Sequence, residues 1–149
     1  MTQVHIIKEM EYHDTHLRPA QILATGVEQR RYFIVVNMGT HPCAYIRIPR
    51  KSPFYQKHYD SLPAFSFFPN GGFTFSDNLY SKYFDQPIKE GWYLGWDYAH
   101  VEDFLPFSKN GKKHTTEEII EETKKIINAL KERENEFNAI ADEAQAKQT

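Results

Sequence analysis

The chain has 149 residues, a net charge of −2 and 40% apolar residues, which is enough to bury the core of one domain. Its single cysteine excludes an intrachain disulfide and fits a reducing compartment. The sequence contains neither the apolar block of a signal peptide nor an apolar run of membrane-spanning length, so we expect a cytoplasmic protein with no membrane partner.

Charge is divided unevenly along the chain. Residues 115–149 carry nine acidic and five basic side chains, whereas residues 1–114 carry eleven acidic and thirteen basic ones. A protein that coats DNA or RNA needs a strongly basic surface. The nearly neutral body therefore argues against long nucleic acid as a partner and leaves room for one small anionic ligand.

The first part of the chain predicts a lead-in strand, a loop and a hairpin. Residues 4–11 are expected to form a strand or short lead-in, and residues 14–19 a loop, because Pro19 disfavours helix before it. The runs RYFIVVN (residues 31–37) and CAYIRIP (residues 43–49) are rich in β-branched and aromatic residues and flank a turn-like segment, which predicts a hairpin.

Side chains alternate in the second strand of this hairpin. Ile46 and Ile48 occupy one face. Tyr45 and Arg47 occupy the other, because successive residues of a strand point to opposite sides of the sheet. We expect the face with Tyr45 and Arg47 to be exposed and to form a working surface.

The middle of the chain predicts a second hairpin. Residues 50–63 contain two prolines and no apolar periodicity, which indicates an excursion over the surface. Residues 64–68 and 73–76 are expected to be strands joined by a turn at residues 69–72.

A loop and a further strand are predicted after this hairpin. The polar and aromatic residues 77–90 are expected to form the loop, and residues 92–98 (WYLGWDY) a strand at the centre of the sheet. Trp92, Leu94 and Trp96 fall on one side of that strand.

A long amphipathic helix is predicted over residues 115–145. Thr115 and Glu118 form a capping box at its start, and apolar residues at three- and four-residue spacing form one stripe. A helix of about 40 Å is longer than a body of this size needs. The distal part, with Phe137 and Ile140, is therefore expected either to pack on another subunit of a homo-oligomer or to fray or lie along the sheet.

These elements together predict an α+β fold: an antiparallel β-sheet body over residues 1–110, followed by a long C-terminal amphipathic helix. The sequence shows no internal repeat, so residues 1–149 are expected to form a single domain.

Metal binding and nucleophilic catalysis are both disfavoured. His13 and His16 form one pair with ligand-like spacing, and His41 and Cys43 another, but a structural zinc site needs four ligands in a closed geometry. Cys43 lies within a strand pattern without a partner base, which favours a buried structural thiol. Phosphate-loop and dinucleotide motifs are absent from the sequence. We therefore assign no catalytic residue, metal or cofactor.

The segment GWDYAH with the acid that follows it is the most distinctive polar group. Asp97 and His100 are three residues apart, and Asp103 follows. Such an acid and histidine suit structural bracing of the next turn, ligand contact or acid–base catalysis. Bracing is the favoured reading of the three.

A second group suits a nucleotide. Aromatic rings stack on bases and arginine binds phosphate through paired hydrogen bonds. Tyr45 and Arg47 share one strand face, Arg50 follows, and Phe73 and Phe75 lie beyond the glycine turn. The alternative is that both phenylalanines point into the core and the arginines are solvated surface charges.

The order of four motifs resembles a group of small proteins common in bacteriophage genomes. The motifs cover about half of the chain and are CAYIRIP (residues 43–49), PFYQKHYD (residues 53–60), GGFTFS (residues 71–76) and WYLGWDYAHVED (residues 92–103). Pro69-Asn70 stands where that group is expected to have a histidine before the glycines. No role that rests on such a histidine is assigned here.

The resemblance extends to the first type of Thoeris anti-defence proteins, phage sponges that sequester cyclic ADP-ribose-type immune signals without cleaving them. It implies a homo-oligomer in the host cytoplasm with ligand pockets near subunit contacts and no enzymatic turnover.

The preferred hypothesis from the sequence is a binding protein for a small anionic nucleotide. The residues expected to contact the ligand are Arg18, Tyr45, Arg47, Arg50, Phe75, Asp97 and His100. A first alternative is an inhibitor that binds a host defence protein through the aromatic surfaces at residues 54–59 and 80–84. A second alternative is a nucleotide hydrolase in which His100 and a neighbouring aspartate form an acid–base pair.

Overall fold

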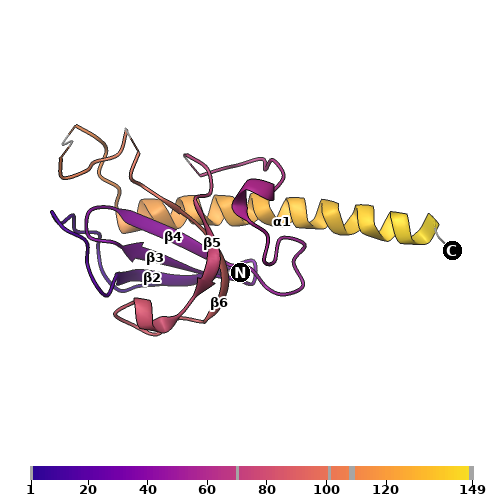
Figure 1. Ribbon diagram of the computed structural model, residues 1–149, viewed down its shortest axis with the longest axis horizontal. Helices are drawn as coiled ribbons and strands as arrows, with labels where there is room; N and C mark the ends of the chain where they lie inside the picture. Colours follow the sequence, from indigo (N-terminus) through magenta and orange to yellow (C-terminus); the bar gives the residue numbers. More distant parts are fainter. Residues whose placement is uncertain (1, 70, 101, 108–109, 148–149) are drawn as a thin grey trace.

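The computed structural model describes residues 2–69, 71–100, 102–107 and 110–147, and it contains a six-stranded antiparallel sheet and one long helix (Figure 1). The strands are β1 (Gln3–Ile6), β2 (Gln21–Glu28), β3 (Arg31–Asn37), β4 (Pro42–Arg47), β5 (Phe75–Leu79) and β6 (Gly91–Asp97), and the helix is α1 (Thr116–Lys147). Short 3₁₀ turns cover Tyr59–Ser61 and Ser81–Tyr83. The strand order is β1-β2-β3-β4-β6-β5, which confirms the predicted α+β fold.

The predicted hairpin is formed by β3 and β4, with Val36 opposite Cys43. Sequence analysis assigned no element to β2, which pairs with β3 and with β1. Gly26 in the middle of β2 is required by packing, because a Cβ there would lie 2.5 Å from Cζ of Phe33. The same glycine weakens the strand signal of the segment.

The predicted second hairpin is wrong. Residues 64–68 form no strand, and β5 pairs with β6 instead. The Phe65 ring packs edge-on against Phe54 and Phe73, at centroid distances of 5.7 and 5.9 Å. The segment therefore contributes an aromatic side chain to the edge of the core without joining the sheet. The backbone N–H of Gly72 donates to the carbonyl of Pro69, so a turn is present there, while Asn70 lies outside the described residues.

The sheet order also corrects two smaller predictions. β5 extends to Leu79, so part of the segment expected to be a loop is an edge strand. β6 lies between β4 and β5, and the centre of the sheet is the β3–β4 pair. The predicted facing of β6 is confirmed, since Leu94 and Trp96 are buried in one core cluster and Tyr93 in the other.

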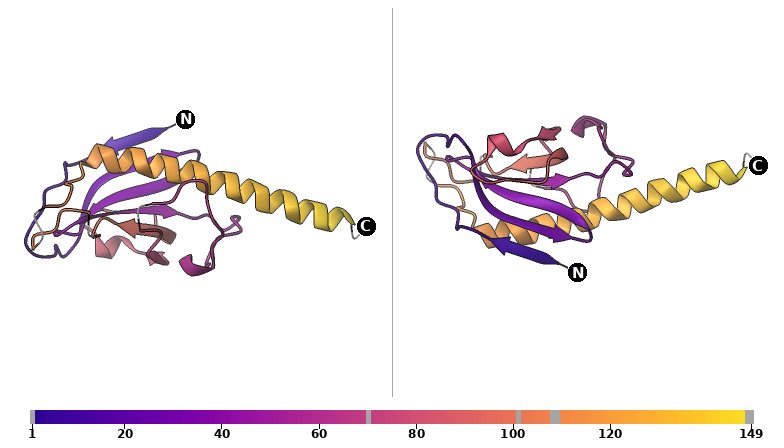
Figure 2. Two further views of the ribbon diagram at one scale, coloured as in Figure 1. Left: turned by 90° about the horizontal axis from the view of Figure 1, so that it is seen from above. Right: turned by 90° about the horizontal axis from the view of Figure 1, so that it is seen from below.

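α1 begins at the predicted capping box. The N–H of Glu118 donates to Oγ1 of Thr115 at 3.1 Å, and the N–H of Thr115 donates to Oε1 of Glu118 at 3.2 Å. One stripe of the helix lies over the sheet (Figure 2), and its buried members include Ile119, Ile126 and Leu130. These side chains close the core against the face that carries Ala44, Ile46 and Trp96.

A buried ion pair fixes the middle of the helix on the sheet. The guanidinium of Arg31 donates to both carboxylate oxygens of Glu134, at 2.9 and 2.7 Å. The Ser52 hydroxyl also donates to this carboxylate. Glu134 is 3% exposed, so the pair is removed from water and sets the position of α1 along β3.

The C-terminal part of α1 extends beyond the sheet (Figure 1). Phe137 touches the body through the Phe54 ring at 5.3 Å, and Ile140, further along, is 65% exposed. Within the described ranges, no helix combines the length and apolar character needed to cross a bilayer.

Candidate functional site

The face of the sheet opposite α1 carries a second, smaller apolar cluster. It includes Ile34, Val36, Tyr45 and Tyr93, and it is covered by residues from the segment that follows β5. Tyr45 and Arg47 do share this face, opposite Ile46. The prediction that Tyr45 is exposed is wrong. Its side chain is only 9% exposed, because its ring packs edge-on against Phe75 at a centroid distance of 5.2 Å.

Gly95 allows these two rings to meet. It lies opposite Tyr45 in β4 and opposite Phe75 in β5, and a Cβ at this position would lie 2.3 Å from Cδ1 of Tyr45. The Tyr45 ring therefore rests against bare backbone of β6. Burial raises the pKa of Tyr45 well above its usual value, so its hydroxyl remains protonated at physiological pH.

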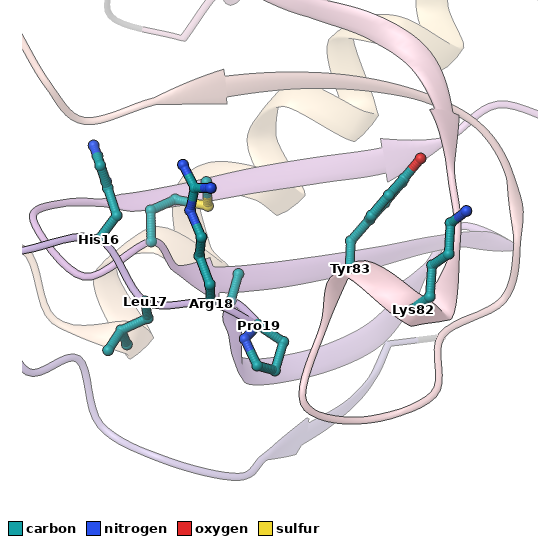
Figure 3. A pocket seen from close by; sticks show the side chains of 8 residues that line it. His16, Leu17, Arg18, Pro19, Lys82 and Tyr83 are labelled. Atoms are coloured by element: carbon teal, nitrogen blue, oxygen red, sulfur yellow. The ribbon is translucent and has the colours of Figure 1, made fainter.

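A cavity of about 580 Å³ opens beside this cluster (Figure 3). It is lined by His16, Leu17, Arg18, Pro19, Ala20, Met38, Lys82 and Tyr83. The side chains of Arg18, Tyr83 and Lys82 extend in the same direction in Figure 3. None of the described residues that line the cavity carries a carboxylate, so its two permanent cations are not neutralised there.

Backbone hydrogen bonds join the two chain segments that supply these cations. The N–H of Ala20 donates to the carbonyl of Tyr83 at 3.1 Å, and the N–H of Asp85 donates to the carbonyl of Ala20 at 2.9 Å. The carboxylate of Asp85 accepts from the N–H of Ile22 at 2.8 Å. The wall of the cavity is thus held in place without a ligand, which favours binding because little ordering remains to be done.

A second cavity of about 320 Å³ lies next to the first one. It is lined by Ala20, Met38, Tyr45, Phe75, Asp77, Asn78, Leu79, Tyr83 and Phe84. Ala20, Met38 and Tyr83 line both cavities, so the two adjoin, and we call them together the open-face groove. Each cavity lies within the usual range of small-molecule sites, roughly 300–1,000 Å³.

The groove combines groups that suit one kind of ligand. Arg18 and Lys82 supply positive charge for phosphate, and the rings of Tyr83 and Phe75 supply surfaces on which a base can stack. Lys82 Nζ lies 5.6 Å from the Tyr83 ring centroid, so the cation and the ring are already side by side.

Comparisons of the chain with protein-family models, curated proteins and solved structures found no match.

The open-face groove brings together three of the seven residues expected to contact the ligand, namely Arg18, Tyr45 and Phe75. Arg47 lies elsewhere, because its Nε and Nη2 donate to the carbonyl of Glu90 at 3.0 and 2.9 Å. Arg50 is exposed in the segment after β4 and lines neither cavity.

Asp97 and His100 lie at the end of β6, away from the groove lining. The Asp97 carboxylate accepts from the N–H of Ala99 at 3.1 Å and from the Thr74 hydroxyl at 3.2 Å, so it braces the turn. Nε2 of His100 lies 3.5 Å from Oδ1 of Asp97 and is buried without a hydrogen-bond partner among the described residues.

Buried Asp103 and half-buried His114 form a pair that was not predicted from the sequence. Asp103 is 2% exposed, and its two carboxylate oxygens contact His114 Nε2 at 2.8 Å and the N–H of His100 at 3.0 Å. This pair ties the segment after β6 to the start of α1. The geometry agrees with the favoured bracing role of the acid–histidine group.

Cys43 is a buried thiol, as predicted, and burial raises its pKa to about 12. His41 is half-buried, and loss of solvation is the main reason that its pKa is lowered. Within the described part of the chain, no cluster of three or more histidine, cysteine or acidic side chains is arranged to hold a metal ion.

Proposed function

We propose that the protein binds a small phosphate-bearing nucleotide in the open-face groove. The observation that carries this proposal is that Arg18, Lys82 and Tyr83 line one cavity, with no carboxylate among its described lining residues (Figure 3). A phosphate group there gains charge-assisted hydrogen bonds, and an attached base gains stacking on an aromatic ring.

The ligand is held without chemical change in this proposal. The acid–histidine group that a hydrolase would use is engaged in bracing, because both carboxylate oxygens of Asp103 contact neighbouring groups of His100 and His114. Its residues also lie outside the groove lining. Retention needs affinity and a preorganised wall, not complementarity to a transition state.

The biological role in this proposal is that of a phage-type anti-defence sponge for a cyclic ADP-ribose-type signal. The four motifs described above support this role, as does a groove suited to a ligand with both phosphate and base. The homo-oligomer that the resemblance implies would use the protruding end of α1, where Ile140 is 65% exposed. Loss of the oligomer in Ile140→Glu, measured by light scattering, tests that part.

The test of the proposal is to incubate the purified protein with cyclic ADP-ribose, ADP-ribose and extracts that contain bacterial immune nucleotides. Free small molecules are then removed, the protein is heat-denatured, and the released material is identified by mass spectrometry. We expect an intact nucleotide from the wild-type protein and none from the Arg18→Ala/Lys82→Ala variant.

Arg50→Ala/Lys51→Ala is the matched control, because it also removes two cations and both residues are exposed outside the groove. Recovery of cleaved products would point to the hydrolase. An empty protein with every nucleotide left in the filtrate would overturn the proposal and favour the inhibitor of a host protein.

A further inference from the structure

The open-face groove is electrically polarised along its length. Its larger cavity is lined by the cations Arg18 and Lys82, and none of its described lining residues is acidic. Its smaller cavity is lined by the acidic residue Asp77, and none of its described lining residues is basic. A bound ligand that carries negative charge at one end is therefore oriented with that end toward Arg18.

Asp77 is an exposed acid on the edge strand β5, beside the smaller cavity. Side chains of β5 alternate between the two faces, so Asp77 lies on the same face as Phe75 and Leu79. Those two neighbours belong to the apolar cluster around Tyr45. The Asp77 side chain therefore borders the smaller cavity between two members of the apolar cluster, where a bound ligand can meet it.

The carboxylate has acceptor capacity to spare. Its hydrogen bond is local, since the N–H of the following residue, Asn78, donates to Oδ1 at 2.7 Å. An ionised carboxylate has about four acceptor positions on its two oxygens. Asp77 is exposed, so a ligand in the smaller cavity can reach the remaining positions.

We infer that Asp77 is a specificity residue that reads a pair of adjacent hydrogen-bond donors on the nucleotide, at the end opposite the phosphate. This inference rests on the proposed function of the groove. Two parts of a nucleotide supply such a donor pair: the 2′,3′-diol of ribose, and the N1–H and N2–H₂ edge of guanine. Both present two donors at the spacing of a carboxylate, which accepts them in a bidentate manner.

The neighbouring groups favour a donor pair over a cation at this place. The rings of Tyr45 and Phe75 lie beside Asp77 in the cavity lining, and they offer a flat apolar wall for a sugar or base. The Tyr45 hydroxyl stays protonated because burial raises its pKa, so it adds no second negative charge.

The test is calorimetric titration of the wild-type protein and Asp77→Asn with ADP, 2′-deoxy-ADP, GDP and inorganic pyrophosphate. The substitution keeps the shape of the side chain but replaces one acceptor by a donor. Asp60→Asn is the matched control, because Asp60 is an exposed acid outside the groove. Thermal unfolding of each variant verifies that it is folded.

We expect Asp77→Asn to lose about 10- to 100-fold in discrimination, which is what a hydrogen bond to a charged group is worth. If the ribose is read, the wild type prefers ADP to 2′-deoxy-ADP, and the variant does not. If guanine is read, the wild type prefers GDP to ADP, and the variant does not. Pyrophosphate, which reaches only the cations, binds both proteins.

If Asp77→Asn binds the nucleotides with the same affinity ratios as the wild type, Asp77 has no role in recognition. The proposed function would still stand in that case. Failure of the wild type to bind either the nucleotides or pyrophosphate would overturn the proposed function, and the inference with it.

Discussion

The two faces of the sheet are buried in different ways. One face is covered mainly by a single continuous element, α1, whose apolar stripe and buried Glu134 fit against β3 and β4, with Phe54 and Phe65 of the segment after β4 at its edge. The other face is covered by an irregular segment after β5, which seals Tyr93 but leaves the open-face groove beside Tyr45. Stability therefore resides mainly on the helix side, and the irregular side is free to carry a binding site.

The largest expected effect on the helix side is that of Glu134→Ala. Removing this carboxylate leaves the guanidinium of Arg31 buried and unpaired, which lowers the free energy of unfolding by about 3–5 kcal/mol. Urea unfolding measures the change. Glu143→Ala on the exposed end of the same helix should stay within about 0.5 kcal/mol. Equal effects of the two substitutions would show that the ion pair does not hold the helix.

A pair of substitutions tests whether stability and binding are separated between the faces. Ile126→Ala opens a cavity under α1 and should lower the free energy of unfolding by about 2–5 kcal/mol. Tyr83→Ala removes a ring that is 45% exposed, so its cost in stability should be small. In calorimetry, it should weaken nucleotide binding, because stacking on a base is worth about 1–3 kcal/mol. The reverse pattern would refute the division of roles.

Gly95→Ala tests the floor of the groove. The added methyl group would collide with the Tyr45 ring, and overpacking of this kind costs about 1–3 kcal/mol. Displacement of the ring should also alter the smaller cavity and weaken ligand binding more than the loss of stability alone explains. The control is Glu143→Ala on the exposed end of α1, which should leave both stability and binding unchanged. Unchanged binding by Gly95→Ala would exclude the Tyr45 ring from the site.

The smallest expected effect concerns pH and the start of α1. The hydrogen bond from Lys112, together with the N–H of Thr115, lowers the pKa of Glu118 below its ordinary value of 4.5. A lowered folded-state pKa stabilises the protein above the unfolded pKa, and this contribution is lost as the pH falls through the folded value. Glu118→Gln should therefore flatten the acid side of the stability curve by under about 1 kcal/mol, given the exposure of the group. An unaltered slope would remove Glu118 from the account of acid unfolding.

The sequence predicted the elements whose signals are local. The capping box at Thr115 and the apolar period of α1 determine the helix, and the β-branched runs determine the β3–β4 hairpin. The pairing of β5 with β6 could not be predicted from the local pattern. The aromatic residues at 64–68 have the composition of a strand, but in the structure their rings pack at the edge of the core without forming one. β2 was not predicted because Gly26 weakens the strand pattern of its segment. The fold nevertheless needs a glycine there, since a Cβ would collide with the Phe33 ring.

The candidate site was only partly accessible to sequence reasoning. Arg18, Tyr45 and Phe75 were expected to act together and do line one groove, although Tyr45 is buried rather than exposed. Lys82 and Tyr83 were not assigned to the site. They are brought close to Arg18 by an isolated β-bridge between Ala20 and Phe84, and such a long-range pairing is not visible in the local sequence. The aromatic content of residues 80–84 was the one signal that singled out this segment.

The central claim is that the cations of the open-face groove hold a phosphate-bearing nucleotide. The most direct measurement is isothermal titration of ADP and cyclic ADP-ribose into the wild-type protein, Arg18→Glu and Arg50→Glu, which carry the same charge change at two exposed arginines. We predict that Arg18→Glu weakens binding by at least about 100-fold, since a repulsive carboxylate replaces a phosphate contact, and that Arg50→Glu binds like the wild type. Equal binding by the two variants, or no binding by the wild type, would contradict the account.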